Sequence, residues 1–404
     1  MTAIAPPTDE APALTVLSLN AGSSSLKFGL YRVRSTGAEV LLSGEAEAIG
    51  EPAGRCSAQD AHGAPLLDEK GPMPSQADAL VRVGKLLADK GHEAPEAIGH
   101  RIVHGGPRLR HHCLVDATVL RELEAASAFA PLHAPAALAA IRFAQSHFPG
   151  TPQAACFDTA FHADMPDVAR ILPIARELQS DGVQRYGFHG LSCQSIVRQI
   201  AGGPPGRLIV AHLGAGASVT AIRDGRSVDT SMGLTPTGGV MMAARSGDLD
   251  PGVLLYLMRE KGFDAGQIED LVDRRSGLLG VSGVSGDMRA LHDASASNSA
   301  ARLAVEMFCY SVAKQIAAMI AVLDGIDLLV FTAGVGENDA AVRAAICAHL
   351  GWIGVELDPT HNQSATNPIG AGGSRCAVLI LPSREDEEIA RQAWALCSRQ
   401  ARRG

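Results

Sequence analysis

Three turns that are rich in glycine interrupt apolar stretches of this sequence. They are NAGSSSLK at 20–27, HLGAGAS at 212–218 and TAGVGEN at 332–338. Glycine lets the backbone N–H groups of a turn converge on an anion and lets that anion approach closely. Each turn taken alone is equally compatible with an ordinary reversal of the chain. Three of them in one chain favour a polyphosphate ligand.

The first turn carries a further signal, because a lysine follows it. Lys27 falls inside the apolar pattern LKFGLYRV, and a cation placed among apolar residues needs an anionic partner. The chain contains neither a Walker A sequence nor the dinucleotide-binding fingerprint. A nucleotide would therefore be bound by a different fold.

Four other segments place polar side chains beside apolar stretches or glycines. Arg101 lies in GHRIVHGG, Asp158 in CFDTAFH, His189 in RYGFHGLS and Arg245 in AARSGDLDPG. The histidines can equally be core or turn residues, and Asp158 can equally cap a helix or stabilise a turn. The arginines are harder to explain structurally, because their planar donors match carboxylates and phosphoryl groups. Together these groups indicate phosphoryl transfer, with the acceptor left open.

The elements that must position these groups form a mixed α/β pattern that occurs twice. TVLSLN and LKFGLYRV predict a hairpin across the first turn, and residues 207–228 repeat the order of strand, glycine turn and strand. Residues 326–338 predict a strand that ends in the third turn, before a helix capped by Asn338 or Asp339. A ligand cleft between the two halves is expected. Apolar periodicity predicts helices at 75–90, 117–129 and 301–323, the last buried on nearly all sides, and a C-terminal amphipathic helix at 385–403.

Length and composition limit the class of protein. The 404 residues suffice for two domains, and the net charge of −8 argues against a nucleic-acid surface built on positive charge. The eight cysteines include no Cys-x-x-Cys pair, which favours reduced thiols in a cytoplasmic protein. No apolar run reaches the ~20 residues of a membrane span. Residues 1–13 lack the pattern of a signal peptide and are predicted to be a disordered extension.

The chain resembles the acetokinase family, within the superfamily that includes sugar kinases, actin and the heat-shock ATPases. The resemblance implies an α/β fold of two domains with duplicated βββαβαβα, ribonuclease H-like cores, an active-site cleft between them, and a homodimer. The implied domains are 14–158 with 387–404, and 159–386 for nucleotide binding. The resemblance rests on motifs in the family's order: NAGSSSLK, GHRIVHGG, APLHAP, FDTAFH, RYGFHG, HLGAGAS, DTSMGLTPTGG, ARSGDLDPG, SGLLGVSG and FTAGVGEN.

The activity that this resemblance implies is a reversible, Mg²⁺-dependent transfer of a phosphoryl group from ATP to acetate, with Mn²⁺ as an alternative metal. The products would be acetyl phosphate and ADP, and neither nucleic acid nor membrane would be a partner. A propionate or butyrate kinase is the nearest alternative, because an apolar pocket discriminates one methylene by only ~1–3 kcal/mol. A nucleotide-binding regulator with weak catalysis is a second alternative.

Matching positions carry the family's site residues onto this chain. The implied catalytic set is Arg101 and Arg245 for the carboxylate and the transition-state charge, His189 for the phosphoryl oxygens, and Asp158. The implied metal set is Asp158, Glu385 and Asn20, with Asp386 as the alternative to Glu385. The implied acetate pocket is Arg101, Val103, Leu132, Phe188 and Pro236. The implied phosphate and nucleotide contacts are Asn20, Ser23, Ser25, Lys27, His212, Gly214, Gly216, Asp287, Arg289, Gly334, Val335, Gly336 and Asn338. His133 and His212 are further motif histidines that can equally be structural.

The chain departs from the family's pattern in three loops. Ala215 replaces the asparagine of HLGNG, Leu191 and Cys193 replace threonine and histidine in GFHGTSH, and PTGG at 236–239 replaces PLEG. Lost donors near the phosphates would lower turnover or alter the nucleotide preference. No arginine and no acid of the implied metal set is lost, so an active enzyme is expected.

Overall fold

The computed structural model describes residues 12–22, 24–89, 94–130 and 133–401. The predicted disordered extension therefore lies outside the described residues up to residue 11, and so do the site residues Ser23 and Leu132. Pro12 is described, and its carbonyl accepts a hydrogen bond from Nε1 of Trp394 at 3.0 Å.

The chain divides into two compact units. The first combines Met1–Ala160 with Arg384–Gly404, and the second is Phe161–Ser383. Glu385 and Asp386 thus belong to the same unit as the first glycine-rich turn.

An eight-stranded sheet forms the first unit, in the order β5-β4-β3-β2-β1-β6-β8-β7. The predicted hairpin is confirmed, because β1 and β2 pair antiparallel from Leu14 opposite Val33 to Ala21 opposite Leu26. β1, β6 and β8 pair in parallel, so their carboxyl ends lie at one edge of the sheet. The strands are β1 (Leu14–Ala21), β2 (Leu26–Arg34), β3 (Gly37–Glu47), β4 (Gly54–Asp60), β5 (Pro65–Gly71), β6 (Ala97–Ile102), β7 (Cys113–Leu114) and β8 (Gln153–Phe157).

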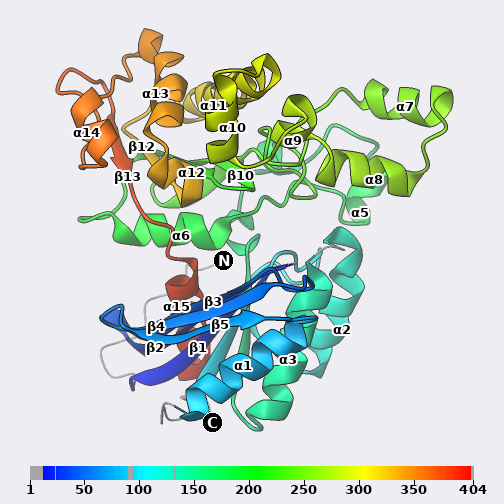
Figure 1. Cartoon of the computed structure of the whole chain (residues 1–404), viewed down its shortest axis with the longest axis vertical. Helices are drawn as coiled ribbons and strands as arrows, with labels where there is room; N and C mark the ends of the chain where they lie inside the picture. The colour runs from blue at the N-terminus through cyan, green and yellow to red at the C-terminus, as the bar shows by residue number, and fades with distance from the viewer. Residues whose placement is uncertain (1–11, 23, 90–93, 131–132, 402–404) are drawn as a thin grey trace. The chain divides into compact units, whose positions relative to one another are not determined.

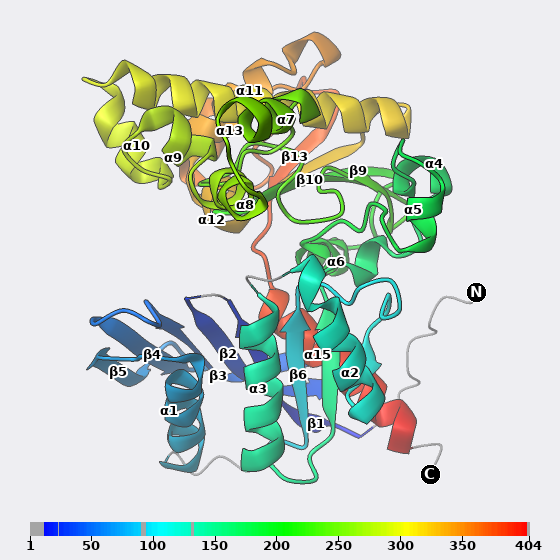
Figure 2. The ribbon, with the colours of Figure 1, turned by 90° about the vertical axis from the view of Figure 1, so that its right-hand side faces the viewer.

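Helices cover both faces of this sheet, as Figures 1 and 2 show. α1 and α3 pack against each other and on one face, over a core that includes Leu17, Phe28 and Leu80. The predicted C-terminal helix is confirmed as α15, which packs against β1, β2, β6 and β8 and carries four acids in its first turn. The helices of this unit are α1 (Gln76–Asp89), α2 (Ala117–Ala125), the 3₁₀ turn η1 (Ala126–Phe129), α3 (Ala134–His147) and α15 (Glu385–Ala401).

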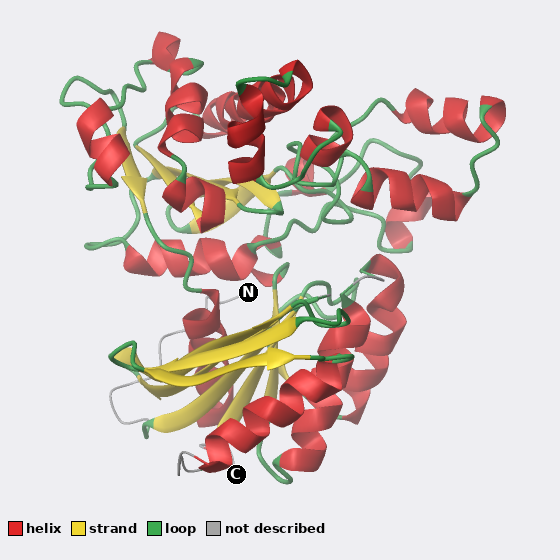
Figure 3. Ribbon diagram, viewed as in Figure 1, coloured by secondary structure: helices red, strands yellow, loops and turns green. Residues whose placement is uncertain are grey.

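The second unit has a five-stranded sheet in the order β11-β10-β9-β12-β13. The second predicted hairpin is confirmed, because β9 and β10 pair antiparallel across the turn at 214–216, and β12 pairs in parallel with both β9 and β13. α6 packs on β9, and α11 packs on β9, β10 and β11; Figure 3 shows helices on both faces of this sheet. The strands are β9 (Arg207–Leu213), β10 (Ala217–Arg223), β11 (Arg226–Thr230), β12 (Leu328–Thr332) and β13 (Ala377–Ile380).

The helices of the second unit lie before and between these strands. They are α4 (Asp167–Arg170), α5 (Glu177–Ser180), α6 (Gly190–Gln199), α7 (Pro251–Glu260), α8 (Ala265–Arg274), α9 (Gly277–Ser282), α10 (Met288–Ser295), α11 (Ser299–Leu323), α12 (Ala333–Asn338), α13 (Ala340–Ala348) and α14 (Pro359–Ser364). Short 3₁₀ turns occur at η2 (Ala160–His162) and η3 (Gly351–Ile353).

The two sheets share one strand plan. β3-β2-β1-β6-β8 of the first unit corresponds to β11-β10-β9-β12-β13 of the second, each with three antiparallel strands followed by two parallel ones. β4, β5 and β7 extend the first sheet beyond this plan. The sequence repeat was therefore the visible trace of a duplicated core.

Two expectations about the second unit are wrong. The third glycine-rich turn is not an open turn, because its residues form α12. Of the two expected caps for the next helix, α13, Asp339 is confirmed, because its side chain accepts a hydrogen bond from the N–H of Val342. α11 is not buried on nearly all sides, because Leu303, Met307 and Tyr310 are exposed along one face. By length and composition alone α11 is apolar enough to cross a membrane, a property that core helices of soluble proteins share.

Candidate active site

A polar cluster lies at the carboxyl ends of the parallel strands of the first unit. Asn20 is near the end of β1, Arg101 is near the end of β6, and Asp158 directly follows β8. Glu385 and Asp386 begin α15, where the positive end of the helix dipole favours acidic side chains. Residues from four distant segments are thus brought together, at the edge where open α/β sheets bind their ligands.

Arg101 and Asn20 hold this cluster together. Nε and Nη2 of Arg101 donate to Oδ2 of Asp158 at 2.9 and 2.6 Å, and Nη1 donates to Oδ1 of Asn20 at 3.2 Å. Nδ2 of Asn20 donates to Asp386 at 3.1 Å and to Glu385 at 3.4 Å. One guanidinium and one amide therefore connect all three acids.

The acids carry an excess of negative charge that their surroundings do not fully neutralise. Burial raises the pKa of Asp386 to about 6, with Asn20 opposing the shift. Burial also raises the pKa of Asp158, against the lowering effect of Arg101. Oδ1 of Asp158 is buried and has no hydrogen-bond partner among the described residues. An additional cation would lower the pKa of both acids and would give Oδ1 of Asp158 a partner.

The donors of this cluster fit Mg²⁺ or Mn²⁺ bound together with phosphates. Within the described residues no group of three or more His, Cys, Asp or Glu side chains is arranged to hold a metal by itself. Magnesium in kinases, however, is bound by one or two carboxylates, water and the phosphates of the substrate. Oδ1 of Asp158 and the carboxylates of Glu385 and Asp386 meet that requirement, whereas Oδ1 of Asn20 already accepts a hydrogen bond from Arg101.

The first glycine-rich turn is fixed by a residue that sequence reasoning missed. Nε2 of Gln76, the first residue of α1, donates to the carbonyls of Gly22 and Ser25 at 2.8 and 3.3 Å. The N–H of Gly22 also donates to the carbonyl of Ser25 at 2.8 Å. No sequence signal pointed to Gln76, because the contact joins residues 54 positions apart.

Lys27 lies in β2 between the buried residues Leu26 and Phe28, and it has the acidic neighbours that its place in an apolar strand led us to expect. The side chain of Lys27 is exposed, although Gly29 and Tyr31, which follow it at alternate positions of β2, are buried. In the sheet Lys27 lies opposite Glu45 on one neighbouring strand and Asn20 on the other. The positive charge of Lys27 also lowers the pKa of Asp386, against the larger effect of burial.

In the second unit, the turn between β9 and β10 faces a histidine and an arginine. A Cβ atom added to Gly216 would lie 3.3 Å from Nε2 of His189 and 3.5 Å from Nη1 of Arg245. Glycine at this position keeps open a space that both side chains border. A histidine ring and a guanidinium around a glycine turn can bind the oxygens of a phosphoryl group.

Neighbouring side chains fix the orientation of His189. Its backbone is left-handed, with φ of 59°, a conformation that non-glycine residues adopt rarely and mainly at functional sites. Nδ1 shares a hydrogen bond with Oγ of Ser218 at 2.9 Å, and the ring stacks on His212 with centroids 4.0 Å apart. Nδ1 of His212 in turn shares a hydrogen bond with Oγ of Ser192 at 2.8 Å. The two histidines are thus a supported pair.

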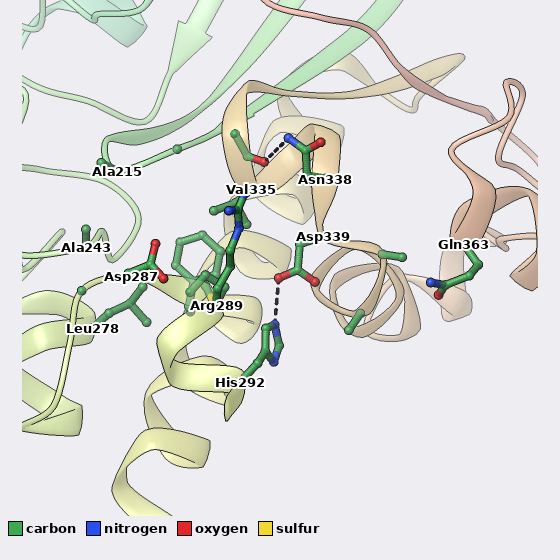
Figure 4. A pocket seen from close by; sticks show the side chains of 17 residues that line it. Ala215, Ala243, Leu278, Asp287, Arg289, His292, Val335, Asn338, Asp339 and Gln363 are labelled. Atoms are coloured by element: carbon green, nitrogen blue, oxygen red, sulfur yellow. Dashed lines mark hydrogen bonds and ion pairs between the residues drawn. The ribbon is translucent and has the colours of Figure 1, made fainter. Parts of the chain in front are cut away.

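A cavity of about 700 Å³ lies within the second unit, a size typical of ligand pockets. Figure 4 shows Asp287 and Arg289 at the start of α10, and Val335 and Asn338 on α12, lining this cavity. Gly214 and Gly334 line it as well, so that six of the expected nucleotide contacts meet here. Gly216 and Gly336 are not among the lining residues: Gly216 faces the histidine and the arginine, and Gly336 is buried in α12.

Sequence reasoning missed several residues of this cavity. Nε2 of His292 and Oδ2 of Asp339 lie 2.8 Å apart at its wall, and Gln363 lines it from the end of α14. Phe308 and Leu278 supply apolar surface. Four of these residues come from the separate helices α9, α10, α11 and α14, and Asp339 caps α13. The sequence alone gave no reason to combine them.

The remaining expected site residues lie at separate places. Val103 lines a small apolar cavity of the first unit, and His133 caps α3 by position. The side chain of Phe188 is only 1% exposed, and the carbonyl of Phe188 shares a hydrogen bond with Nε2 of His162 at 3.0 Å. The carbonyl of Pro236 accepts a hydrogen bond from Nη1 of Arg245 at 3.3 Å.

The departures from the family's loops have local explanations. Leu191 and Cys193 are fully buried in α6, where apolar side chains fill the core. Oγ1 of Thr237 donates to Asp273, so this loop residue is tied to α8. Ala215 lines the large cavity with no polar side chain, and its carbonyl accepts a hydrogen bond from the N–H of Ala243 at 3.2 Å.

Comparisons with known proteins show the family and the fold of this chain. The model of the acetokinase family matches residues 15–391. An acetate kinase of Nitrobacter hamburgensis is 41% identical over 390 residues, covering 95% of this chain and 96% of that protein. A propionate kinase structure from Francisella tularensis has a TM-score of 0.88 at 36% identity, and an acetate kinase structure from Porphyromonas gingivalis has a TM-score of 0.84 at 35% identity; each covers 95% of this chain and 100% of the other. These neighbours confirm the predicted α/β fold.

Proposed function

Because the chain belongs to the acetokinase family, we propose that it transfers the γ-phosphoryl group of ATP to acetate, forming acetyl phosphate and ADP reversibly. The observation that carries this proposal is the Gly216 turn, where a histidine ring and a guanidinium border a space without side chains. The adjoining cavity, bordered by Gly214 and the residues of α12, has the size of a nucleotide site.

The chemistry requires charge neutralisation rather than a general base. Acetate is ionised at pH 7, whereas a sugar hydroxyl must lose a proton during transfer. Asp158 is engaged by two donors of Arg101, which suits a role in binding charge and does not suit proton abstraction. We therefore assign Arg101 to the acetate carboxylate, and Arg245 and His189 to the equatorial oxygens of the phosphoryl group in a direct in-line transfer.

The acids of the first unit would hold Mg²⁺ or Mn²⁺. Asp158 and either Glu385 or Asp386 would supply the carboxylates, and Asn20 would orient them through its amide. When bound, the metal neutralises charge on the β- and γ-phosphates. The eight free thiols support a reducing compartment, so we place the enzyme in the cytoplasm.

The first test is formation of acetyl hydroxamate from acetate, ATP, Mg²⁺ and hydroxylamine. The expected result is a product that depends on every component, with kcat/KM for propionate within ~200-fold of that for acetate. A higher kcat/KM for propionate would reassign the substrate, an outcome that the propionate kinase neighbour makes worth measuring. Nucleotide binding without acyl phosphate from any of the three acids would identify a regulator and refute the proposal.

We further propose that two copies of the chain associate. Apolar side chains are exposed on α7 and α11, among them Tyr256, Leu303, Met307 and Tyr310. An apolar surface of this kind is typical of an interaction face. Light scattering should give a mass near twice the chain mass of 42.0 kDa. A single-chain mass at micromolar concentration would contradict this proposal.

A further inference from the structure

Ser383 is the last residue of the second unit, and it makes hydrogen bonds to two different helices. Its N–H donates to Oε1 of Glu337 at 2.9 Å, and its hydroxyl donates to Oγ of Ser192 at 2.9 Å. Glu337 belongs to α12 and Ser192 to α6, two helices that are far apart in the sequence. Neither residue is among the expected contacts of substrate, nucleotide or metal.

The hydrogen bond to Glu337 connects Ser383 with the helix that lines the cavity. Oε1 of Glu337 also accepts a hydrogen bond from the N–H of Ala333 at 2.8 Å. Ala333 begins α12 with a left-handed backbone, φ 65°, which a residue with a Cβ adopts only when its surroundings hold it there. One carboxylate oxygen thus fixes the start of the helix that carries Gly334, Val335 and Asn338.

The hydrogen bond to Ser192 connects Ser383 with the pair of histidines, His212 and His189. Ser192 is fully buried, and its hydroxyl lies between the hydroxyl of Ser383 and Nδ1 of His212, at 2.9 and 2.8 Å. A hydroxyl that accepts a hydrogen bond from one partner can donate to the next, so the hydroxyl of Ser192 can hold the ring of His212 through Nδ1. His212 in turn stacks on His189.

We propose that Glu337 and Ser192 are positioning residues, joined through Ser383 into one hydrogen-bond chain from Ala333 to His212. Glu337 holds α12 in the conformation that binds the nucleotide, and Ser192 holds the histidine pair in the orientation that contacts the phosphoryl group. The inference rests on the proposed roles of α12 and His189. It adds residues that contact neither the nucleotide nor the phosphoryl group. It predicts that loss of Glu337 mainly changes KM for ATP, whereas loss of Ser192 mainly changes kcat.

The variants follow from the separate bonds. Glu337→Ala removes both contacts of the carboxylate, and Glu337→Gln keeps an oxygen that can accept them. Ser192→Ala breaks the link to His212. Ser383→Ala removes only the hydroxyl and keeps the hydrogen bond from the backbone N–H to Glu337. It therefore tests the contact with Ser192 separately from the contact with Glu337. Glu269→Ala and Ser297→Ala change exposed residues of the same unit outside the chain of hydrogen bonds and serve as matched controls.

Loss of a residue that orients a ligand-binding group typically reduces affinity or activity about 10- to 100-fold. Glu337→Ala should raise KM for ATP by about tenfold or more with a smaller change in kcat, and Glu337→Gln should restore most of the loss. Ser192→Ala and Ser383→Ala should instead lower kcat, with KM for ATP near that of the wild type. Because these two variants remove the same hydrogen bond, the double variant should be no worse than Ser192→Ala alone.

Three results would overturn the inference. Equal losses in Glu337→Ala and Glu337→Gln would show that hydrogen-bond acceptance at position 337 is not what positions α12. Multiplicative losses in the double serine variant would show that the two hydroxyls act independently. Parallel falls in kcat, affinity and melting temperature in every variant would show a structural role only. If Glu337→Ala does not fold, Ser383→Ala and Ser192→Ala still test the link.

Failure of the proposed function would look different. In that case the wild-type protein itself would form no acyl phosphate. Binding of a fluorescent ATP analogue then still tests whether Glu337 positions α12. Glu337→Ala should weaken that binding, and Ser383→Ala should not. Unchanged binding in Glu337→Ala would refute the inference in that case as well.

Discussion

Arg245→Ala should lower kcat for acetyl phosphate formation by about a thousandfold, the smallest loss typical of arginines that stabilise phosphoryl transfer. Nη1 of Arg245 borders the space beside Gly216, opposite Nε2 of His189. Removing the guanidinium leaves one of the two donors and takes away the positive charge. The fold should persist, because the carbonyl of Arg245 accepts its hydrogen bond from Met242 through the backbone alone.

Matched variants separate charge from geometry. Arg274→Ala removes an exposed arginine of the same unit, paired with Asp270 at 3.9 Å, and should leave turnover unchanged. Arg245→Lys keeps the charge without the planar donors and should recover only part of the activity. Steady-state kinetics with saturating acetate and ATP gives kcat for each variant. Turnover of Arg245→Ala near that of the wild type would exclude a role in the transition state.

Asp158→Asn should raise the Mg²⁺ concentration for half-maximal activity by about 10- to 100-fold, as loss of a metal-binding group usually does. Oδ1 of Asp158 is buried and has no hydrogen-bond partner in the described part of the chain, and the side chain is only 1% exposed. The neutral amide removes the charge that a divalent cation requires. It also leaves Arg101 without its buried anion, which costs about 3–5 kcal/mol of stability when one member of a buried pair is removed.

Urea unfolding must therefore accompany the metal titration. Glu385→Gln is the second variant for this experiment, because Glu385 is partly exposed and lies 3.4 Å from Nδ2 of Asn20. A Glu385→Gln protein that is as stable as the wild type should still require more Mg²⁺. Identical Mg²⁺ activation curves for the wild type and both variants would remove these acids from the metal site.

Local patterns predicted much of the secondary structure correctly. Alternation of apolar residues predicts the hairpins at the first and second glycine-rich turns. Helical periodicity predicts α1, α11 and α15. α12 was missed because its six residues are too few to show a helical period and two of them are glycines. The exposed face of α11 was missed because apolar composition on all sides does not reveal which sides are covered.

Lys27 and Gln76 show the same limit at the first turn. The residue types around Lys27 indicated an apolar strand, but only the sheet decides that its side chain points outward. Gln76 fixes the turn from a helix that follows three further strands, and polar glutamines at helix starts are common. In both cases the decisive contact joins distant segments of the chain.

The sequence by itself determined the motifs, their order and the kinds of chemistry that their side chains can perform. Those properties reside in single residues and their immediate neighbours. Tertiary structure alone decided that Arg101, Asp158 and Asn20 meet at the ends of parallel strands, that Gly216 faces His189 and Arg245, and that Ser383 joins α12 to α6. Contacts of this kind depend on strand order and register, which are set by the packing of the whole core and not by any local pattern.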